Sequence, residues 1–352
     1  MLFLGESWYG SSARACSASL RRLGCEVHDI DGSTFFPPVR SRGLRALLRA
    51  LRPWLVREYN AAAMDAALTL KPDMLIAFKG AHLQARSLRR VREAGIPAYN
   101  YYPDTSPTAH GPWLAEALPQ YDCVFYTKRY WHEAFRESLG LRESVYLPHG
   151  YDPEIHRPCA LDDRDRAELG HAVTVIATYT RHKEVVLESL LARMPELDLC
   201  IWGHQWRERA SSAVVRRHAR GVALTGARYA KAIGASAINL AIMSGAVAGA
   251  PQGDETTTRT FEIPASGGFM LHERTPEVAG VFEEGREIAC FGSGDELAAQ
   301  IRHFLDRPVE REAMRRAALR RCVPAYSYEK RMATLLAWHE ARAGRERLGS
   351  VR

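Results

Sequence analysis

Short apolar runs alternate with longer amphipathic segments along the whole chain of 352 residues. Apolar runs of four to eight residues between turn signals are typical of buried strands, and apolar residues at every third or fourth position are typical of helices. Strands that alternate with helices in this way indicate a parallel sheet covered by helices on both faces. The pattern therefore predicts an α/β fold, and the length predicts two domains.

The first half of the chain, residues 1–150, predicts one Rossmann-like domain. Its first strand is followed by a turn rich in glycine and serine and then by a helix. Helices are also expected over residues 41–68. The expected strands are MLFLG, CEVHDID, DMLIAFK, IPAYNYY, DCVFYT and SVYLPHG.

The pattern changes at LPHGYDPEIHRP, where three prolines and a glycine interrupt regular structure. We expect residues 148–163 to link the first domain to a second Rossmann-like domain at 164–325. A final amphipathic helix is expected over residues 326–345. Two doubly wound sheets in series predict a ligand cleft between their carboxyl ends. The expected strands of the second domain are AVTVIATY, LDLCIWG, GVALTG, SAINLAI, GFMLHE and EIACFG, with a helix from about Lys183.

One short helix between two expected strands carries charges in apolar company. Its sequence, TTTRTFEIPASGGFM, includes Arg259 and Glu262. Backbone N–H groups at the start of a helix favour anions, and a carboxylate one turn further on can accept two hydrogen bonds from a vicinal diol such as a ribose. The alternative is that Thr256 is an N-cap and Glu262 a solvated helix residue.

A second candidate anion site follows the first strand of the second domain. The segment ATYTRHKE offers Thr178, Arg181 and Lys183 where a strand ends and a helix begins. Hydroxyl groups and cations at a helix N-terminus bind phosphate, although a solvated helix start has the same composition.

Four blocks of the second half resemble the CgeB-like glycosyltransferases, which lie within the larger retaining GT-B class. The longest block runs from Arg259 to Leu305, and the others are IATYT, LCIWGHQW and LPHGYDPEIHRP. The resemblance implies a GT-B fold, in which two Rossmann-like domains face each other across a cleft and the C-terminal helix returns to the first domain. It also implies retaining transfer of a sugar from a nucleotide-diphospho sugar, with no cofactor and no catalytic metal.

The resemblance assigns roles around the donor. In this class an E-x(7)-E motif contacts the donor, and Glu262 matches the second position, which meets the ribose. The first position, which meets the sugar hydroxyls, is open between Asp254 and Glu255. Arg181 is expected to act in catalysis, because cations stabilise the growing charge of the leaving diphosphate. The remaining donor-binding residues are expected to be Thr178, Lys183, Gly203, His204, Thr258 and Arg259.

The segment WGHQW places a glycine turn between two aromatic residues, a composition suited to the border of a nucleobase site. Trp202 and Trp206 are equally suited to packing. On the acceptor side, Asp104 and His110 lie on a polar loop after a strand, and either can orient an acceptor hydroxyl. A loop that faces the donor diphosphate is expected at Gly5, Ser7, Gly10 and Ser11.

Charge and composition narrow the partners. The formal net charge of +7 suits anionic ligands, while interspersed acidic residues argue against nucleic acid. Seven cysteines without metal spacing indicate reduced thiols and a cytoplasmic protein. The arginine-rich helix at 44–59 either lies on an anionic membrane or packs on the core. The acidic DDRD at 162–165 resembles a metal-binding motif but is expected to start a helix.

Two other functions remain open at this point. A sugar-nucleotide 2-epimerase shares the architecture and needs no acceptor, and a non-catalytic two-lobed binding protein would also show two α/β halves. The acceptor, whether carbohydrate, lipid-linked, protein or small molecule, is not defined by the sequence.

Overall fold

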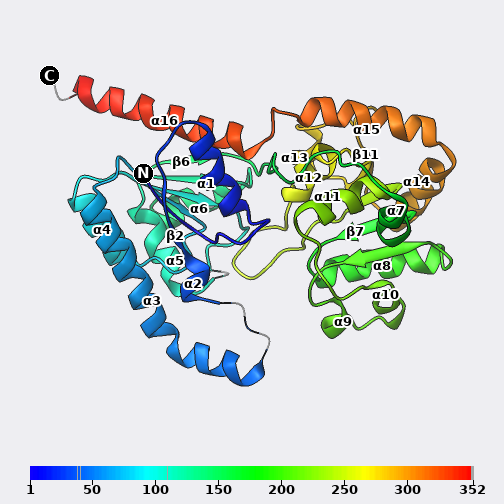
Figure 1. The fold of residues 1–352 in the computed structure, drawn as a ribbon, viewed down its shortest axis with the longest axis horizontal. Coiled ribbons are helices and arrows are strands. Elements are labelled where there is room, and N and C mark those ends of the chain that lie inside the picture. The colour runs from blue at the N-terminus through cyan, green and yellow to red at the C-terminus, as the bar shows by residue number, and fades with distance from the viewer. Residues whose placement is uncertain (38, 40, 109, 350–352) are drawn as a thin grey trace. The chain divides into compact units, whose positions relative to one another are not determined.

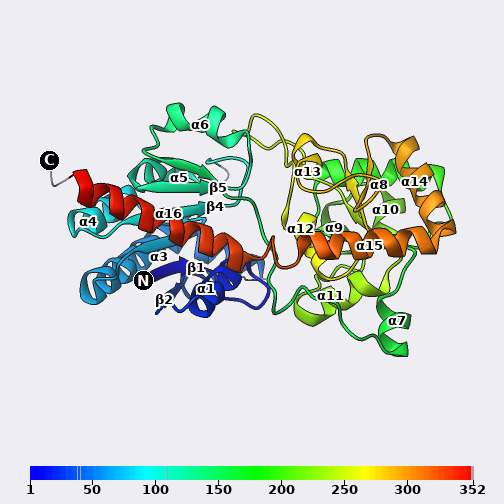
Figure 2. The same cartoon turned by 90° about the horizontal axis from the view of Figure 1, so that it is seen from above.

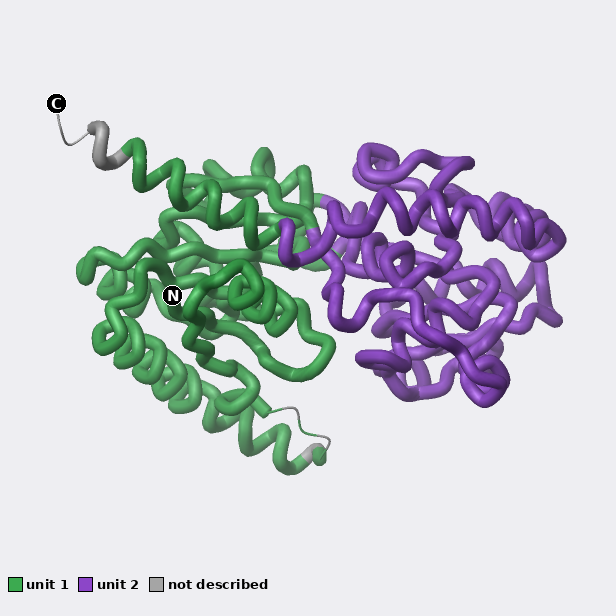
Figure 3. The backbone as a smooth tube through the Cα atoms, turned by 45° about the horizontal axis from the view of Figure 1, so that its top comes forward, with its two compact units in different colours: residues 1–148, 247–251, 331–352 green, residues 149–246, 252–330 purple. Residues whose placement is uncertain are grey.

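The computed structural model describes residues 1–37, 39, 41–108 and 110–349. The chain divides into two compact units (Figure 3). Unit 1 comprises Met1–Pro148, Val247–Pro251 and the described residues from Arg331 onward, and unit 2 comprises His149–Ala246 and Gln252–Lys330. The division at Pro148 falls inside the segment expected to be a linker.

Unit 1 is built on a parallel sheet of six strands in the order β2-β1-β3-β4-β5-β6 (Figure 1). Its central strands are buried on both faces, which explains why they appear in the sequence as uninterrupted apolar runs. The elements are β1 (Leu2–Gly5), α1 (Ser12–Arg22), β2 (His28–Asp31), α2 (Gly32–Phe35), α3 (Arg42–Leu70), β3 (Leu75–Phe78), α4 (Ala85–Glu93), β4 (Ala98–Tyr102), α5 (Pro112–Ala117), a 3-10 turn (Leu118–Gln120), β5 (Cys123–Tyr126), α6 (Trp131–Leu139) and β6 (Ser144–Tyr146).

The two faces of this sheet are covered from distant parts of the chain. Helices α3 and α4 pack on one face through Tyr59, Ala63 and Leu88. The last helix of the chain, α16 (Tyr328–Gly349), covers the other face (Figure 2). The Trp338 ring lies 5.6 Å from the rings of both Tyr99 and Phe125.

Polar contacts also hold α16 on unit 1. The Tyr99 hydroxyl lies 2.8 Å from Nδ1 of His339. Arg342 donates to Asp122 at 3.0 Å, and the same carboxylate accepts the backbone N–H of Ala98. The C-terminal helix is therefore part of the folded core of unit 1.

Unit 2 has a parallel sheet of five strands in the order β11-β10-β9-β7-β8. Helices α8, α10 and α14 share one apolar core with the sheet, and α11, α12 and α15 share another on the opposite face. The elements are α7 (Asp163–Leu169), β7 (Val173–Ile176), α8 (Arg181–Arg193), β8 (Leu199–Trp202), α9 (Trp206–Arg209), α10 (Ala213–His218), α11 (Gly226–Ala235), β9 (Ile238–Ala241), α12 (Thr258–Ala265), β10 (Met270–Glu273), α13 (Pro276–Ala279), β11 (Ala289–Phe291), α14 (Gly294–Asp306) and α15 (Pro308–Cys322).

One expected strand of unit 2, GVALTG, does not form. The preceding residues run beside β8, the edge strand of the sheet, and make an isolated bridge between Ile201 and Ala219. The N–H of Gly203 then donates to the carbonyl of Val222, and pairing ends there. By contrast, DDRD starts a helix as predicted, because Asp162 caps α7 by accepting the N–H of Asp165 at 2.7 Å.

Candidate functional site

The sheet of unit 2 changes direction between β7 and β9. From β7 the chain moves to β8 on one side, and from β9 it moves to β10 and β11 on the other. In doubly wound sheets, ligands bind outside the carboxyl ends of the strands at such a switch point. A ligand site is therefore expected among the residues that follow β7 and β9.

Lys183 bridges the two strand ends at this switch point. It lies in the first turn of α8, and its side chain is buried. Its Nζ donates to the hydroxyl of Ser244, which follows β9, at 3.0 Å, and to the carbonyl of Thr178, which follows β7, at 3.4 Å. Burial and the nearby charge of Arg259 lower the pKa of Lys183 to about 7.

Arg259 brings a second cation to the same place from the first turn of α12. Its Nη2 donates to the carbonyl of Ile242 at 3.0 Å, while its buried Nε has no hydrogen-bond partner among the described residues. The charge of Asp254 raises the pKa of Lys183, whereas the charge of Arg259 lowers it. The backbone N–H of Asp254 donates to the carbonyl of Ser244 at 2.9 Å. Lys183 and Arg259 thus bring two cations to the residues that follow β7 and β9, and Asp254 and Glu273 are the carboxylates that raise the pKa of Lys183. Such cations suit a diphosphate.

Glu262 is held in place one turn further along α12. The hydroxyl of Tyr229 donates to its Oε2 at 2.6 Å, and Nε2 of His156 lies 3.7 Å from its Oε1. The carboxylate is 13% exposed, so the alternative of a solvated Glu262 is wrong. Thr256 is not the N-cap either, because Thr257 occupies that position and Thr256 is buried.

Arg181 points to a different group of residues. Its Nη1 lies 2.8 Å from Oε2 of Glu184 and donates to the hydroxyl of Ser211 at 3.0 Å. Although burial raises the pKa of Glu184, hydrogen bonds from Ser212, Arg181 and Tyr179 lower it to about 2. Among the contacts of the described residues, Arg181 therefore belongs to this buried carboxylate and not to the cluster of Lys183 and Arg259.

The turn after β8 has a structural explanation. Gly203 has a φ of 143°, and a Cβ there would lie 1.9 Å from the carbonyl oxygen of Ala177. The indole of Trp206 donates to the same carbonyl at 2.6 Å. Trp202 and Trp206 are both buried, which confirms the packing interpretation of these rings, while His204 is exposed.

The other donor-side candidates lie in loops at the same edge of the sheet. Thr178 is exposed just after β7, and Thr258 is half-buried in the first residue of α12. The backbone carbonyl of Glu255 accepts the hydroxyl of Thr275 at 2.7 Å. Of the two acids left open for the first position of the motif, Asp254 is the one with an electrostatic effect on Lys183.

Sequence reasoning missed three residues at this edge. Glu273, the last residue of β10, accepts the N–H of Met243 at 2.8 Å and lies 2.8 Å from Nε2 of His182. Its hydrogen bond raises the pKa of His182. The other two residues are His182 itself and Ser244. All three lie at or shortly after the carboxyl end of a strand, and this position was the signal that could have identified them.

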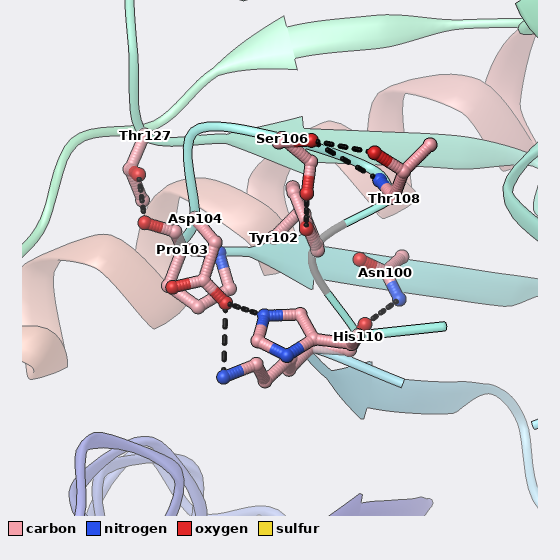
Figure 4. A network of polar contacts seen from close by, with 9 residues as sticks. Asn100, Tyr102, Pro103, Asp104, Ser106, Thr108, His110 and Thr127 are labelled. Carbon is pink, nitrogen blue, oxygen red and sulfur yellow. Dashed lines mark hydrogen bonds and ion pairs between the residues drawn. The ribbon is translucent and has the colours of Figure 1, made fainter. Parts of the chain in front are cut away.

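Unit 1 carries its own polar cluster at the carboxyl ends of β3 and β4 (Figure 4). Oδ2 of Asp104 lies 2.6 Å from Nε2 of His110 and 2.9 Å from Nζ of Lys79. Burial alone would raise the pKa of Asp104, but the hydrogen bond from His110 and the charge of Lys79 hold it well below its usual value. The structure thus brings the two acceptor-side candidates together and adds Lys79.

Lys79 occupies a strained turn that the sequence analysis overlooked. Its φ is 65°, in the left-handed region that is uncommon for residues other than glycine, and Gly80 follows with a φ of 70°. A Cβ on Gly80 would lie 2.7 Å from the amide nitrogen of Asn100. Backbone strain of this kind concentrates at functional sites, where the surrounding structure maintains it.

The glycine- and serine-rich loop after β1 is tied down internally. The N–H of Ser7 donates to Asp31 at 3.2 Å, and its hydroxyl donates to the same carboxylate. Ser11 caps α1 by accepting the N–H of Arg14. Gly10 has a φ of 103°, and a Cβ on Gly5 would lie 2.7 Å from that of Ala13. The hydroxyl of Ser7 thus has its partner at the end of β2, and the hydroxyl of Ser11 has a partner in the first turn of α1.

Comparisons with known proteins identify the class. Residues 181–337 match the model of a family described as glycosyl transferase-like. Sucrose-phosphate synthase from Thermosynechococcus elongatus is similar in structure, with 13% identity, 97% of this chain and 99% of that chain covered, and a TM-score of 0.69. A glycosyltransferase from Rickettsia africae ESF-5 gives 10% identity, coverage of 97% and 98%, and a TM-score of 0.64. Anabaena HepE in complex with UDP and glucose is 12% identical, with 97% of this chain and 100% of that chain covered and a TM-score of 0.62. No curated protein matches the sequence.

These likenesses confirm the predicted fold: two α/β units with parallel sheets, as in GT-B proteins. The family match begins at the first residue of α8 and contains Lys183, Arg259 and Glu262. Fold and match together define the protein as a glycosyltransferase.

Proposed function

We propose that this protein moves a sugar from a nucleotide-diphospho sugar to an acceptor hydroxyl, with retention and without a catalytic metal, as a CgeB-like member of the group 1 glycosyltransferases. The observation that carries the proposal is the contact of Lys183 with Ser244 beside Arg259, at the switch point of unit 2. The similar structure of HepE is a complex with UDP and glucose, which supports a nucleotide sugar as the donor.

Lys183 and Arg259 would hold the diphosphate of the donor. Each brings a donor group to the start of a helix, where backbone N–H groups add to the attraction for an anion. Glu262, oriented by Tyr229, would accept the ribose hydroxyls. Asp254 would take the first acid position of the motif and meet the hydroxyls of the sugar.

The reaction would need no nucleophile from the protein. The acceptor oxygen bonds to the anomeric carbon as the bond from that carbon to the diphosphate breaks, and the acceptor proton passes to the departing phosphate oxygen. Because negative charge grows on the diphosphate, Lys183 and Arg259 stabilise the transition state more than the ground state. A catalytic role for Arg181 stays a prediction, and its ion pair with Glu184 favours a structural role.

Unit 1 would supply the groups that orient the acceptor. Asp104 is charged and bonded to both His110 and Lys79, so it can accept a hydrogen bond from an acceptor hydroxyl while the imidazole and the ammonium fix its position. Such a role is one of positioning. We place the reaction in the cytoplasm, where nucleotide sugars and reduced thiols coexist.

A panel of UDP, GDP, TDP and ADP in a thermal-shift assay tests donor binding, and mass spectrometry after incubation with the matching nucleotide sugars tests the reaction. We expect stabilisation by one nucleotide, and slow hydrolysis or transfer of its sugar. Epimerised donor would instead indicate a sugar-nucleotide 2-epimerase, and a donor bound but unchanged with every acceptor would indicate a binding protein. The absence of any nucleotide-dependent shift would refute the donor site itself.

A further inference from the structure

The N-terminal half of α3 exposes a row of large apolar side chains. Leu44, Leu47, Leu51 and Trp54 are 44%, 52%, 41% and 52% exposed. Their spacing of three and four residues places them on one face of the helix. The C-terminal half is anchored differently, since Tyr59 and other side chains there are buried against the sheet of unit 1. Figure 1 shows the first turns of α3 extending beyond that sheet.

The same half of α3 is strongly basic. Residues 42–57 include five arginines and no acidic residue. Arg45, Arg49 and Arg52 are exposed and recur at intervals of four and three, so they form a second face on the side of the helix opposite the apolar one. A helix with an apolar face that includes tryptophan and with an arginine-rich polar face has the composition of a helix that lies in the interface of a bilayer.

We propose that the face formed by Leu44, Leu47, Leu51 and Trp54 docks on the surface of an anionic lipid bilayer. The apolar side chains would enter the boundary between headgroups and acyl chains, and the arginines on the far side of the helix would attract the anionic headgroups over about one Debye length. Among the described residues no helix is long and apolar enough to cross a membrane, so the contact is peripheral.

A second copy of the chain fits this face less well. In a symmetric dimer the same patch contacts itself, and such a contact supplies no anionic group for the arginines of either copy. Four side chains also fall short of the roughly 20 residues per partner that a stable interface needs. A bilayer satisfies both faces of the helix at once.

Sedimentation with vesicles tests the proposal on the full chain and without substrates, so its outcome is independent of the proposed reaction. We expect the partition coefficient on phosphatidylcholine vesicles that contain about 30% phosphatidylglycerol to exceed that on pure phosphatidylcholine at least about tenfold, and to fall with added salt. The double variants Leu47→Ser with Trp54→Ser and Arg45→Gln with Arg49→Gln should each lower it about tenfold.

Matched controls separate docking from general effects. Leu68 and Leu70 are 40% and 48% exposed at the other end of α3, so their double change to Ser should leave binding unchanged. The control for charge is the double variant Arg316→Gln with Arg320→Gln at exposed positions of α15, which should also leave binding unchanged. Circular dichroism and Tm establish that each variant folds. Failure of the wild type to bind, equal loss in the controls, or a dimer in light scattering that Leu47→Ser with Trp54→Ser disrupts would overturn the proposal.

Discussion

Binding of a nucleoside diphosphate should be coupled to protonation of Lys183. Burial and the charge of Arg259 lower the pKa of this ammonium from 10.5 to about 7, so at pH 8 only about a tenth of the free protein carries the proton. A diphosphate beside Nζ favours the charged form and raises that pKa. Binding at pH 8 therefore requires uptake of nearly one proton.

The coupling has a calculable size. Above the pKa of the free protein, only the protonated fraction binds well, and that fraction falls about eightfold between pH 7.5 and 8.5. The affinity for UDP, the probe of choice, should fall by the same factor. The phosphates of UDP are already ionised over this range, since their last pKa is near 6. The change in affinity thus reports on the protein.

Isothermal titration calorimetry measures both quantities. Titrations at pH 8 in buffers of different ionisation enthalpy count the proton, and titrations at pH 7.5 and 8.5 give the affinities. The variant Lys183→Met should bind at least about tenfold more weakly and lose the pH dependence. It should fold as stably as the wild type or better below pH 7, because the folded state no longer carries a buried charge whose pKa is depressed.

Lys231→Met is the matched control. Lys231 belongs to the same unit, and its ion pair with Asp165 raises its pKa, so it stays charged throughout. This variant should keep the affinity of the wild type and its pH dependence. Equal UDP affinity at pH 7.5 and 8.5, or an enthalpy that does not depend on the buffer, would refute the assignment of Lys183 to the diphosphate.

Three further predictions concern the same unit. Glu262→Ala should raise the Kd for UDP by about tenfold to a hundredfold, because a hydrogen bond to a charged acceptor is lost. Glu188→Ala, a change at an exposed position of α8, should leave the Kd unchanged. Equal affinities of wild type and Glu262→Ala in calorimetry would mean that Glu262 serves only to hold Tyr229 by its hydrogen bond. Arg259→Ala should weaken UDP binding more than about tenfold, while Arg181→Ala should leave it within about threefold and lower Tm; the reverse order would restore a catalytic role for Arg181. Turnover, followed by mass spectrometry, should survive EDTA, and rescue of a lost activity by Mn²⁺ or Mg²⁺ would contradict the proposed metal-free mechanism.

The fold could be predicted because most of its strands are buried on both faces. Such strands stand out as short apolar runs, and the helices between them have a different period. The exception, GVALTG, is apolar enough for a strand but follows a segment at the open edge of β8, where a single bridge with Ala219 completes the pairing. Which strand forms the edge follows from the order of the sheet, which local sequence does not contain.

The donor-side residues could be predicted as a group but not sorted into partners. Arg181 and Lys183 are two residues apart, so they point to opposite sides of α8. Lys183 shares its side with the buried Leu187 and Leu190, and this helical phase was the signal that could have separated the two cations. The pairing of Lys79 with Asp104 was out of reach, because it depends on β3 and β4 lying side by side.

The packing of α16 on unit 1 sets the order in which the chain can fold as it is made. Domains usually fold from the N-terminus during synthesis, at roughly 5–20 residues per second. Unit 1 starts that process, yet Trp338 and Arg342, which cover Tyr99 and Phe125 and bind Asp122, leave the ribosome only after all of unit 2. For roughly 10–40 s, therefore, the face of the unit 1 sheet that carries Tyr99 and Phe125 is not yet covered by α16. Nascent chains of this protein should depend on chaperones most strongly in that interval, and its C-terminal helix acts as the step that completes the unit that was begun first.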